Sequence, residues 1–317
     1  MSKVSIAIPT YNRVDYLKEC VESILNQTFQ DFSVFVFDNA SEQPVKEEME
    51  KFGDERIKFI GNDKNIGSAG NINRILEHSF DSEYLIVFHD DDLMHPMMLE
   101  IEISLMESQQ EAVFLVSNLN RVSDENAKVF SEIEKEKMEP RIYENNSEFA
   151  KAIMNWTRFA FDSAVYRIKF INEDRMNFNR FSDLADIAFL AGLSQKGPSI
   201  FVDAPLVNYR VHPGQDSKSF KGSYRKGALE ALSFLKEILS SDRKFFFKHS
   251  LNLLLYFYTY INQGWGDFSK YLREARDRNF IKYRNFAHID LYGLVSLASI
   301  IFKSRKVFDI ARFFRRK

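Results

Sequence analysis

Roughly the first 120 residues alternate between short apolar runs and amphipathic stretches, and this alternation constrains the fold more than any other feature. The runs are rich in β-branched and aromatic residues, as strands are, and the stretches between them carry apolar residues at helical spacing. The predicted strands are Val4–Ile8, Ser33–Phe37, Arg56–Ile60, Tyr84–Phe88 and Ala112–Ser117, and the predicted helices are Arg13–Gln27, Glu42–Lys51, Ser68–Ser79 and Pro96–Glu107. This order predicts an α/β fold with a mostly parallel sheet and helices on both faces.

The rest of the chain shows shorter elements and then a helical region. Residues 118–143 are polar and charged, and they predict a strand followed by a loop. The further predicted elements are helices at Ser147–Asn155 and Asp183–Leu193 and strands at Ser163–Tyr166, Ile200–Val202 and Leu206–Arg210. After a polar link, His212–Ser223, we expect helices to the end, with Leu251–Ile261 apolar enough to be buried. We therefore predict a first domain over residues 1–217 and a C-terminal helical region over residues 218–317.

The composition is that of a globular protein. Of the 317 residues, 45% are hydrophobic and 28% charged, which supplies a sizeable core. The single cysteine, Cys20, excludes an internal disulfide framework, and its place on the apolar stripe of the first predicted helix favours a buried structural thiol. The chain enters a strand by Val4 without a signal peptide, so we expect a cytoplasmic protein.

The C-terminal tail is basic and rich in phenylalanine. Residues 301–317 hold seven Lys/Arg and one Asp, a local charge of +6, and they overlap an apolar run of 12 residues, Leu291–Phe302. That run is too short to span a bilayer, which takes about 20 residues. The pattern suits either a helix lying on anionic lipid at the inner membrane face, or a helix packed on the protein with a solvated basic end. No basic stripe occurs elsewhere in the sequence, so we expect no nucleic-acid partner.

Three adjacent aspartates, Asp90-Asp91-Asp92, follow the predicted strand Tyr84–Phe88. Their carboxylates repel one another unless something positive lies among them. Mg²⁺ or Mn²⁺ takes one or two protein carboxylates and fills its other positions with water and substrate phosphates. The carboxyl end of a strand is also where open α/β sheets bind ligands. The alternative is a solvated acidic turn that begins a helix.

Polar loops follow the other predicted strands as well. Pro9-Thr10-Tyr11-Asn12-Arg13 lacks the glycines of a dinucleotide-binding turn, but it offers an aromatic ring that could stack on a base. Asp38 ends the second strand, where it could accept a hydrogen bond from a pyrimidine imide or cap the next helix. The loop Asn62–Asn71 contains glycines that permit close approach to a sugar or phosphate.

These segments occur in the order and spacing of the family 2 glycosyltransferases, which the chain resembles. The segments that carry the resemblance are Val4–Arg13, Asp38, the Asn65-x-Gly67 loop and the aspartate triplet. Two later segments extend it: Ala185–Gly197 resembles the family's acidic helix start and Lys-Gly turn, and Asn208–Gly214 resembles its Tyr-Arg-x-His-x-Gly strand and loop. The resemblance covers residues 3 to 217, not the tail past Ser223, and it implies a nucleotide-sugar-dependent enzyme of the GT-A fold.

The resemblance implies a donor site at the ends of these strands. Its nucleotide-sugar-binding residues would be Pro9, Thr10, Tyr11, Asn12, Arg13, Asp38, Asn65, Gly67, Asn71, Asp90 and Asp91. Thr10, Tyr11 and Asp38 would hold the base, a uracil. Asn65 and Gly67 would lie near the ribose.

The resemblance also implies a cofactor, Mn²⁺ or Mg²⁺, bound by Asp91, Asp92 and His212. Asp91 aligns best with the metal-binding aspartate of the family's Asp-x-Asp motif. His89 stands where the first aspartate of that motif often sits, which leaves open which carboxylate of the triplet meets the ribose and which the metal.

Asp186 would be the catalytic general base by the same resemblance. Ala185 replaces the glutamate usual beside it, and Asp183, one helical turn earlier, is the competing candidate. The expected acceptor contacts are the segment Trp156–Tyr166 and the loop Asn118–Pro140.

The function expected from these residues is an inverting transfer of a sugar from a UDP-sugar to a hydroxyl of a glycan or lipid-linked acceptor in surface polysaccharide synthesis. Two alternatives stay open. One is a catalytically degenerate scaffold attached to a membrane by the tail. The other is a nucleotidyltransferase, which shares the sheet and metal chemistry but usually opens with a Gly-rich basic loop where this chain has Pro9–Asn12.

Overall fold

The computed structural model describes residues 2–135, 138–155, 161–171, 174–212, 214, 223–261, 271 and 273–280. The chain divides into two compact units. The first comprises Met1–Asn145, Arg158–Met176 and Gly192–Gln215, and the second comprises Asn146–Thr157, Asn177–Ala191 and Asp216–Lys317. The domain boundary at residue 217 stays a prediction.

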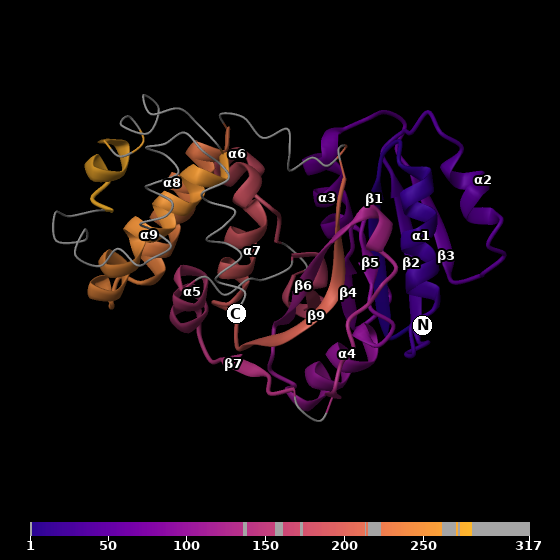
Figure 1. Cartoon of the computed structure of the whole chain (residues 1–317), viewed down its shortest axis with the longest axis horizontal. Helices are drawn as coiled ribbons and strands as arrows, with labels where there is room; N and C mark the ends of the chain where they lie inside the picture. The colour runs from indigo at the N-terminus through magenta and orange to yellow at the C-terminus, as the bar shows by residue number, and fades with distance from the viewer. Residues whose placement is uncertain are drawn as a thin grey trace. The chain divides into compact units, whose positions relative to one another are not determined.

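One sheet organises the first unit (Figure 1). Within the described residues it has nine strands, in the order β3-β2-β1-β4-β8-β6-β9-β5, with β7 paired to β9. Their bounds are β1 Val4–Thr10, β2 Phe32–Asp38, β3 Ile57–Gly61, β4 Tyr84–Val87, β5 Leu93–Met94, β6 Phe114–Ser123, β7 Arg141–Tyr143, β8 Val165–Arg167 and β9 Ser199–Val211.

Most strands of this sheet point in one direction. Strand β1 pairs in parallel with β2 and β4, β2 with β3, and β6 with β9. Strand β8 lies between β4 and β6 and is antiparallel to both, so β4 and β6 share a direction. Only β5, β7 and β8 therefore run against the other six described strands. The predicted α/β fold with a mostly parallel sheet is confirmed.

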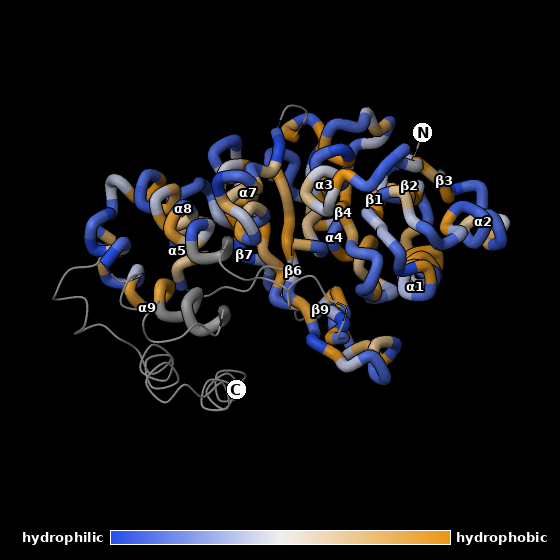
Figure 2. Tube along the Cα trace, turned by 90° about the horizontal axis from the view of Figure 1, so that it is seen from above, coloured by the Kyte–Doolittle hydropathy of each residue, from blue (hydrophilic) through white to orange (hydrophobic). Residues whose placement is uncertain are grey.

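Amphipathic helices cover the sheet of the first unit. They are α1 Val14–Leu25, α2 Val45–Glu50, α3 Gly67–Glu77 and α4 Met98–Ser108, with short 3-10 helices η1 Asp124–Asn126, η3 Phe161–Ser163 and η4 Ile168–Phe170. The buried face of α1 carries Leu17, Cys20, Val21 and Ile24, so Cys20 is a core residue as predicted. Hydrophobic residues concentrate along the strands, and the connecting loops are mostly hydrophilic (Figure 2).

The second unit consists mainly of helices. They are α5 Asn146–Met154, α6 Phe178–Phe181, η5 Ser182–Leu184, α7 Ala185–Leu193, α8 Ser223–Ile238 and α9 Arg243–Ile261, and the last two residues of α7 belong to the first unit. Helix α8 packs against α6, η5 and α9. The predicted C-terminal helices are thus confirmed up to Ile261. Leu251, Leu253 and Leu254 of α9 are buried. Among the described residues, no helix is both long and apolar enough to cross a membrane. The basic tail, 301–317, lies outside the described residues.

Strand β9 differs from the prediction of two separate strands. It is a single strand of 13 residues whose pairing with β6 shifts register near Pro205. A proline has no N–H for the ladder, and a bulge accommodates it without ending the strand. The two-residue strand β5, which pairs with β9, was not predicted, because two residues are too few to show a period.

Candidate active site

The carboxyl ends of β1, β2 and β4 meet at one edge of the sheet. Thr10, the last residue of β1, is in register with Asp38, the last residue of β2. Strand β4 pairs with β1 on its other side, and the aspartate triplet begins three residues after its end. The parallel arrangement therefore gathers polar loops that are distant in sequence, at the edge where such sheets bind ligands.

Asp90 contacts the end of β1 and the segment that follows it. The Thr10 hydroxyl donates a hydrogen bond to its Oδ2 at 2.7 Å, and the Arg13 Nη1 lies 3.5 Å from its Oδ1. Burial raises the pKa of Asp90 to about 7, with a further contribution from the Asp91 carboxylate, although Arg13 and Thr10 act in the opposite direction. Near neutral pH this carboxyl is therefore partly protonated, and a cation bound beside it would displace that proton.

Asp91 joins the triplet to the end of β9. Its Oδ2 lies 2.9 Å from the His212 Nε2 and 3.1 Å from the Arg13 Nη1. The Nη2 of Arg13 donates to the Gly214 carbonyl at 2.7 Å, and the Tyr16 ring lies 4.6 Å from the His212 ring, centre to centre. We call Thr10, Arg13, Asp90, Asp91 and His212 the edge cluster. A carboxylate oxygen and an imidazole nitrogen this close together are donors that fit Mn²⁺.

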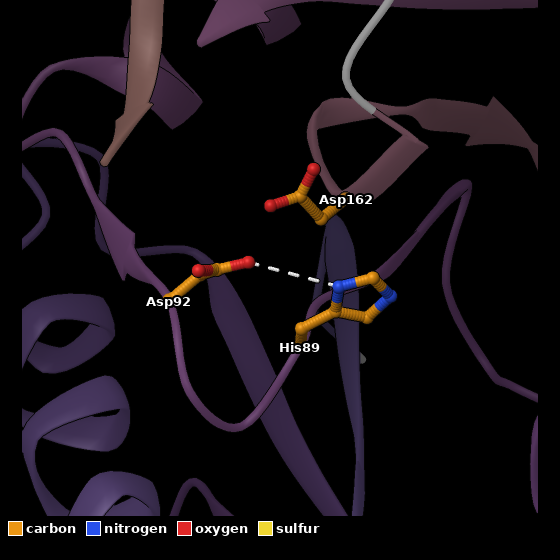
Figure 3. A group of neighbouring side chains, drawn as sticks. All are labelled: His89, Asp92 and Asp162. Atoms are coloured by element: carbon orange, nitrogen blue, oxygen red, sulfur yellow. Dashed lines mark ion pairs between the residues drawn. The ribbon is translucent and has the colours of Figure 1, made fainter. Parts of the chain in front are cut away.

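Asp92 faces different partners, although it adjoins Asp91 in sequence. It is fully buried, and its Oδ1 accepts the Arg210 backbone N–H at 2.8 Å. Its Oδ2 lies 3.7 Å from the His89 Nδ1, and Asp162 of η3 completes a group of three (Figure 3). We call His89, Asp92 and Asp162 the buried cluster. The structure thus brings Asp91 and His212 together and directs Asp92 elsewhere.

Hydrogen bonds join the loop after β1, which carries the 41% exposed Tyr11, to the segment after β2. Asp38 accepts hydrogen bonds from the Ser41 N–H and hydroxyl. The Asn12 N–H donates to the Ser41 hydroxyl at 2.8 Å, and the Asn12 Oδ1 accepts the Glu42 N–H at 2.8 Å. Asn12 adopts a left-handed φ of 53°, which asparagine tolerates better than most residues. Pro9 precedes this loop within β1, in register with Phe37.

An asparagine network fixes the loop that follows β3. The Asn39 side chain donates to the Asn65 Oδ1 at 3.0 Å and accepts from Asn62 and from the Ile66 N–H, each at 2.9 Å. Asn71 accepts from Asn62 at 3.2 Å and donates to the Phe37 carbonyl at 2.8 Å. Asn65 and Asn71, predicted to bind the donor, thus hold the loop in shape. Asn39 and Asn62 were not assigned from sequence, although the density of asparagines here was a visible signal.

Gly67 begins α3 in a conformation that suits glycine. Its φ is 78°, a left-handed value that side chains with a Cβ rarely adopt. Its N–H donates to the Asn65 Oδ1 at 2.8 Å, so the turn into α3 is fixed by the side chain two residues before it. No side chain is present at position 67 to obstruct a ligand that approaches this turn.

Asp186, the predicted general base, lies in the first turn of α7. Its Oδ1 accepts the Ile187 N–H at 2.7 Å. Asp186 and its competitor Asp183 both belong to the second unit, whereas the edge cluster belongs to the first. The assignment of the base stays a prediction.

The predicted acceptor segments are described in part. Of Trp156–Tyr166, the described residues begin at the 3-10 helix η3, Phe161–Ser163. Of Asn118–Pro140, residues 136 and 137 lie outside the description, and the rest contains the end of β6 and η1. Asp162 was not singled out from sequence, because an isolated aspartate before a strand carries no signal of its own.

Comparison with protein families decides the classification. The family model "Glycosyl transferase family 2" matches residues 5–170. The chain belongs to this family. The resemblance seen in the sequence motifs is thereby confirmed, and the protein is classed with glycosyltransferase enzymes.

Curated relatives carry the same classification. An uncharacterized glycosyltransferase of Methanocaldococcus jannaschii is 35% identical over 140 residues, 42% of this chain and 47% of that protein. An uncharacterized glycosyltransferase of Haemophilus influenzae is 22% identical over 97% of this chain and 93% of that protein. An Escherichia coli protein, "UDP-Glc:alpha-D-GlcNAc-diphosphoundecaprenol beta-1,3-glucosyltransferase WfgD", is 30% identical over 103 residues, 32% of this chain and 40% of that protein. The chain thus spans less than half the length of two of these relatives.

A solved structure shares the fold. The crystal structure of residues 1–349 of S. aureus TarS, in complex with UDP, superposes with a TM-score of 0.55 at 16% identity. The match covers 98% of this chain and 91% of that one.

Proposed function

We propose that the protein transfers a sugar from a UDP-sugar to an acceptor hydroxyl, with inversion at the anomeric carbon and with a divalent cation. The observation that carries the proposal is the meeting of Asp91 and His212 at 2.9 Å, in a chain that also leaves the ring of Tyr11, in the segment after β1, exposed. Family membership and the UDP complex of a protein of the same fold support the choice of donor.

The edge cluster offers groups for the leaving diphosphate. Asp91 and His212 would hold Mn²⁺ or Mg²⁺, which supplies Lewis-acid neutralisation of the charge that develops on the departing nucleotide. Arg13 lies against Asp90 and Asp91 with its guanidinium partly exposed, so it can turn from the carboxylates to a phosphate. The exposed Tyr11 ring would stack on the uracil.

In the proposed reaction Asp186 accepts the proton of the acceptor hydroxyl. The acceptor oxygen forms a bond to the anomeric carbon from the face opposite the diphosphate. The bond from that carbon to the diphosphate oxygen breaks, and UDP leaves with the electron pair. A single displacement of this kind inverts the anomeric centre, through a transition state with oxocarbenium character.

The substitution Asp186→Asn tests the base. General-base assistance typically contributes about 10²–10⁴-fold, so kcat falls by that factor while UDP-sugar affinity stays within about twofold. Asp183→Asn is the matched control, and it retains most of the turnover. The opposite result, loss at Asp183 and little change at Asp186, would move the base to Asp183.

A panel of nucleotide sugars tests the reaction itself. With Mn²⁺, the purified protein is expected to release UDP from at least one UDP-sugar, slowly by hydrolysis and faster with an acceptor. If no nucleotide sugar raises the melting temperature and none releases its nucleotide, the proposed function fails and the scaffold alternative stands.

We further propose a lipid-linked acceptor in surface polysaccharide synthesis, at the cytoplasmic membrane face. The E. coli relative is named for a diphosphoundecaprenol acceptor, and the sequence of residues 301–317 carries a local charge of +6 with interleaved phenylalanines. Flotation with anionic vesicles at low salt tests the membrane contact. Recovery of the protein in the unbound fraction would count against it.

A further inference from the structure

The buried cluster contains two carboxylates that each have one oxygen atom without a hydrogen bond from the described residues. Asp92 is fully buried and Asp162 is 3% exposed. The Oδ2 atoms of both accept no hydrogen bond from the described part of the chain, and no described lysine or arginine side chain forms an ion pair with either residue. Buried carboxylates are normally paired or bound to a metal, because removing them from water is costly.

The three side chains converge from two segments of the first unit. His89 and Asp92 lie on the loop between β4 and β5, and Asp162 lies on η3. Figure 3 shows the Asp92 and Asp162 carboxylates and the His89 ring turned toward a common space. One ligand atom from each residue lies within 4.8 Å of the other two. In a tetrahedral site with bonds of about 2.1 Å the ligand atoms lie about 3.4 Å apart, so an inward movement of each side chain by less than about 1 Å lets the three atoms bind one ion.

Asp162 is held at this place by the sheet. Its neighbour Ser163 accepts the Ser117 N–H of β6 at 2.8 Å and donates to the Ser117 carbonyl at 3.2 Å. Asp92 is fixed in turn by the Arg210 N–H of β9. Both carboxylates are therefore positioned by backbone of the sheet, which is the support a metal ligand needs.

We propose that His89, Asp92 and Asp162 form a second cation site, distinct from the edge cluster, that binds a divalent first-row transition-metal ion. Two carboxylates with one imidazole suit Zn²⁺ or Mn²⁺ better than they suit Mg²⁺ or Ca²⁺, which prefer sites made only of oxygen ligands. The ion neutralises the two buried charges and joins η3 to the β4–β5 loop. The His89 side chain is 34% exposed and gives the ion a route from solvent. This site does not depend on the proposed glycosyl transfer.

Equilibrium dialysis of the full chain against Zn²⁺, and separately Mn²⁺, without nucleotide tests the site. The wild type is expected to retain one ion, counted by elemental analysis. Asp162→Asn, which keeps the shape of the side chain, lowers the affinity at least about tenfold, since even partners of metal ligands are worth that much. Asp91→Asn retains the ion, because Asp91 is not among the three ligands of this site. The exposed Asp81→Asn is the control for adventitious binding.

Three results would overturn the site. The first is that the wild type holds no ion, which would mean that the His89 ring alone balances the carboxylates. The second is that Asp162→Asn binds the ion as tightly as the wild type. The third is that Asp91→Asn loses the ion while Asp162→Asn keeps it. His89→Gln is the second variant if Asp162→Asn fails to reach the wild-type circular dichroism spectrum. The dialysis contains no sugar donor, so failure of the proposed transferase activity leaves its result unchanged.

Discussion

The edge cluster and the buried cluster meet at the adjacent residues Asp91 and Asp92, and these two aspartates have different partners. Asp91 interacts with a partly exposed arginine and with a histidine beyond the end of a strand, partners that can exchange for a ligand. Asp92 is fully buried and is held by the backbone of β9. Adjacent carboxylates thus separate into one that faces an exchangeable charge and one that is part of the packed structure.

The largest expected difference is in turnover at Asp91. Asp91→Asn removes a charge at the proposed diphosphate site, and we expect UDP release to fall about 10²–10³-fold, the cost of losing one preorganised electrostatic group. The melting temperature changes little, because the Asp91 partners among the described residues are two side chains, Arg13 and His212. UDP release and thermal unfolding measured on the same preparation check both parts.

Asp81→Asn is the matched control, since Asp81 is exposed and precedes the start of β4, at the opposite end from the triplet. Full activity of Asp91→Asn, or a loss equal to that of Asp81→Asn, would remove the functional half of the comparison.

A smaller effect, on stability, is expected at Asp92. Asp92→Asn keeps an oxygen that accepts the Arg210 N–H, and Asp92→Ala does not. Leaving a buried donor without an acceptor costs about 1–3 kcal/mol, so the alanine variant unfolds at lower urea concentration than the asparagine variant. Both variants are uncharged, which removes the electrostatic contribution from the difference. Equal midpoints in urea unfolding would show that the hydrogen bond does not fix this part of the sheet.

The smallest effect concerns a buried acid outside both clusters. Glu102 of α4 is fully buried, its carboxylate oxygens accept no hydrogen bond from the described residues, and burial raises its pKa well above the ordinary 4.5. The charge of Asp162 acts in the same direction. The native state therefore holds a proton that the unfolded chain releases above pH 4.5, so this group lowers stability as pH rises from there.

Glu102→Gln removes that pH dependence. We expect its advantage over the wild type to grow between pH 5 and 8 to about 1 kcal/mol, measured by thermal unfolding at each pH. Glu100→Gln is the control on the same helix: hydrogen bonds from Lys135 and Thr28 lower the pKa of Glu100, so its contribution is lost as pH falls. A Glu102→Gln advantage that is constant with pH would mean that Glu102 is ionised in the native protein.

The first strands and helices were predictable because each one shows its own pattern of apolar residues within a continuous stretch of sequence. The predicted strand Val4–Ile8 became Val4–Thr10, and the predicted helix Arg13–Gln27 became Val14–Leu25. The boundaries of these two elements moved by two residues at most, since apolar spacing sets which residues enter an element and caps decide only its ends. The placement of β8 between β4 and β6 was not predictable, because strand order depends on pairing between segments far apart in sequence.

The candidate site, too, was predictable only in part. That the loops after β1, β2 and β4 share one edge follows from parallel pairing, and the sequence motifs supplied the residue types. Which way each aspartate of the triplet turns did not follow, because adjacent side chains on a loop have no fixed alternation. The direction of Asp92 is set by the Arg210 N–H, 118 residues away, and by Asp162 on a separate 3-10 helix.

The register of β9 against β6 affects both clusters of aspartates. Near the end of β9, the backbone N–H of Arg210 donates to Asp92. Two residues later, the imidazole of His212 contacts Asp91. The alignment of β9 with β6 is established from Ser199 onward and passes through the irregularity near Pro205. Deleting one residue there would exchange the inward and outward faces of everything downstream, so both groups of aspartates would lose their partners together, from a change made many residues away.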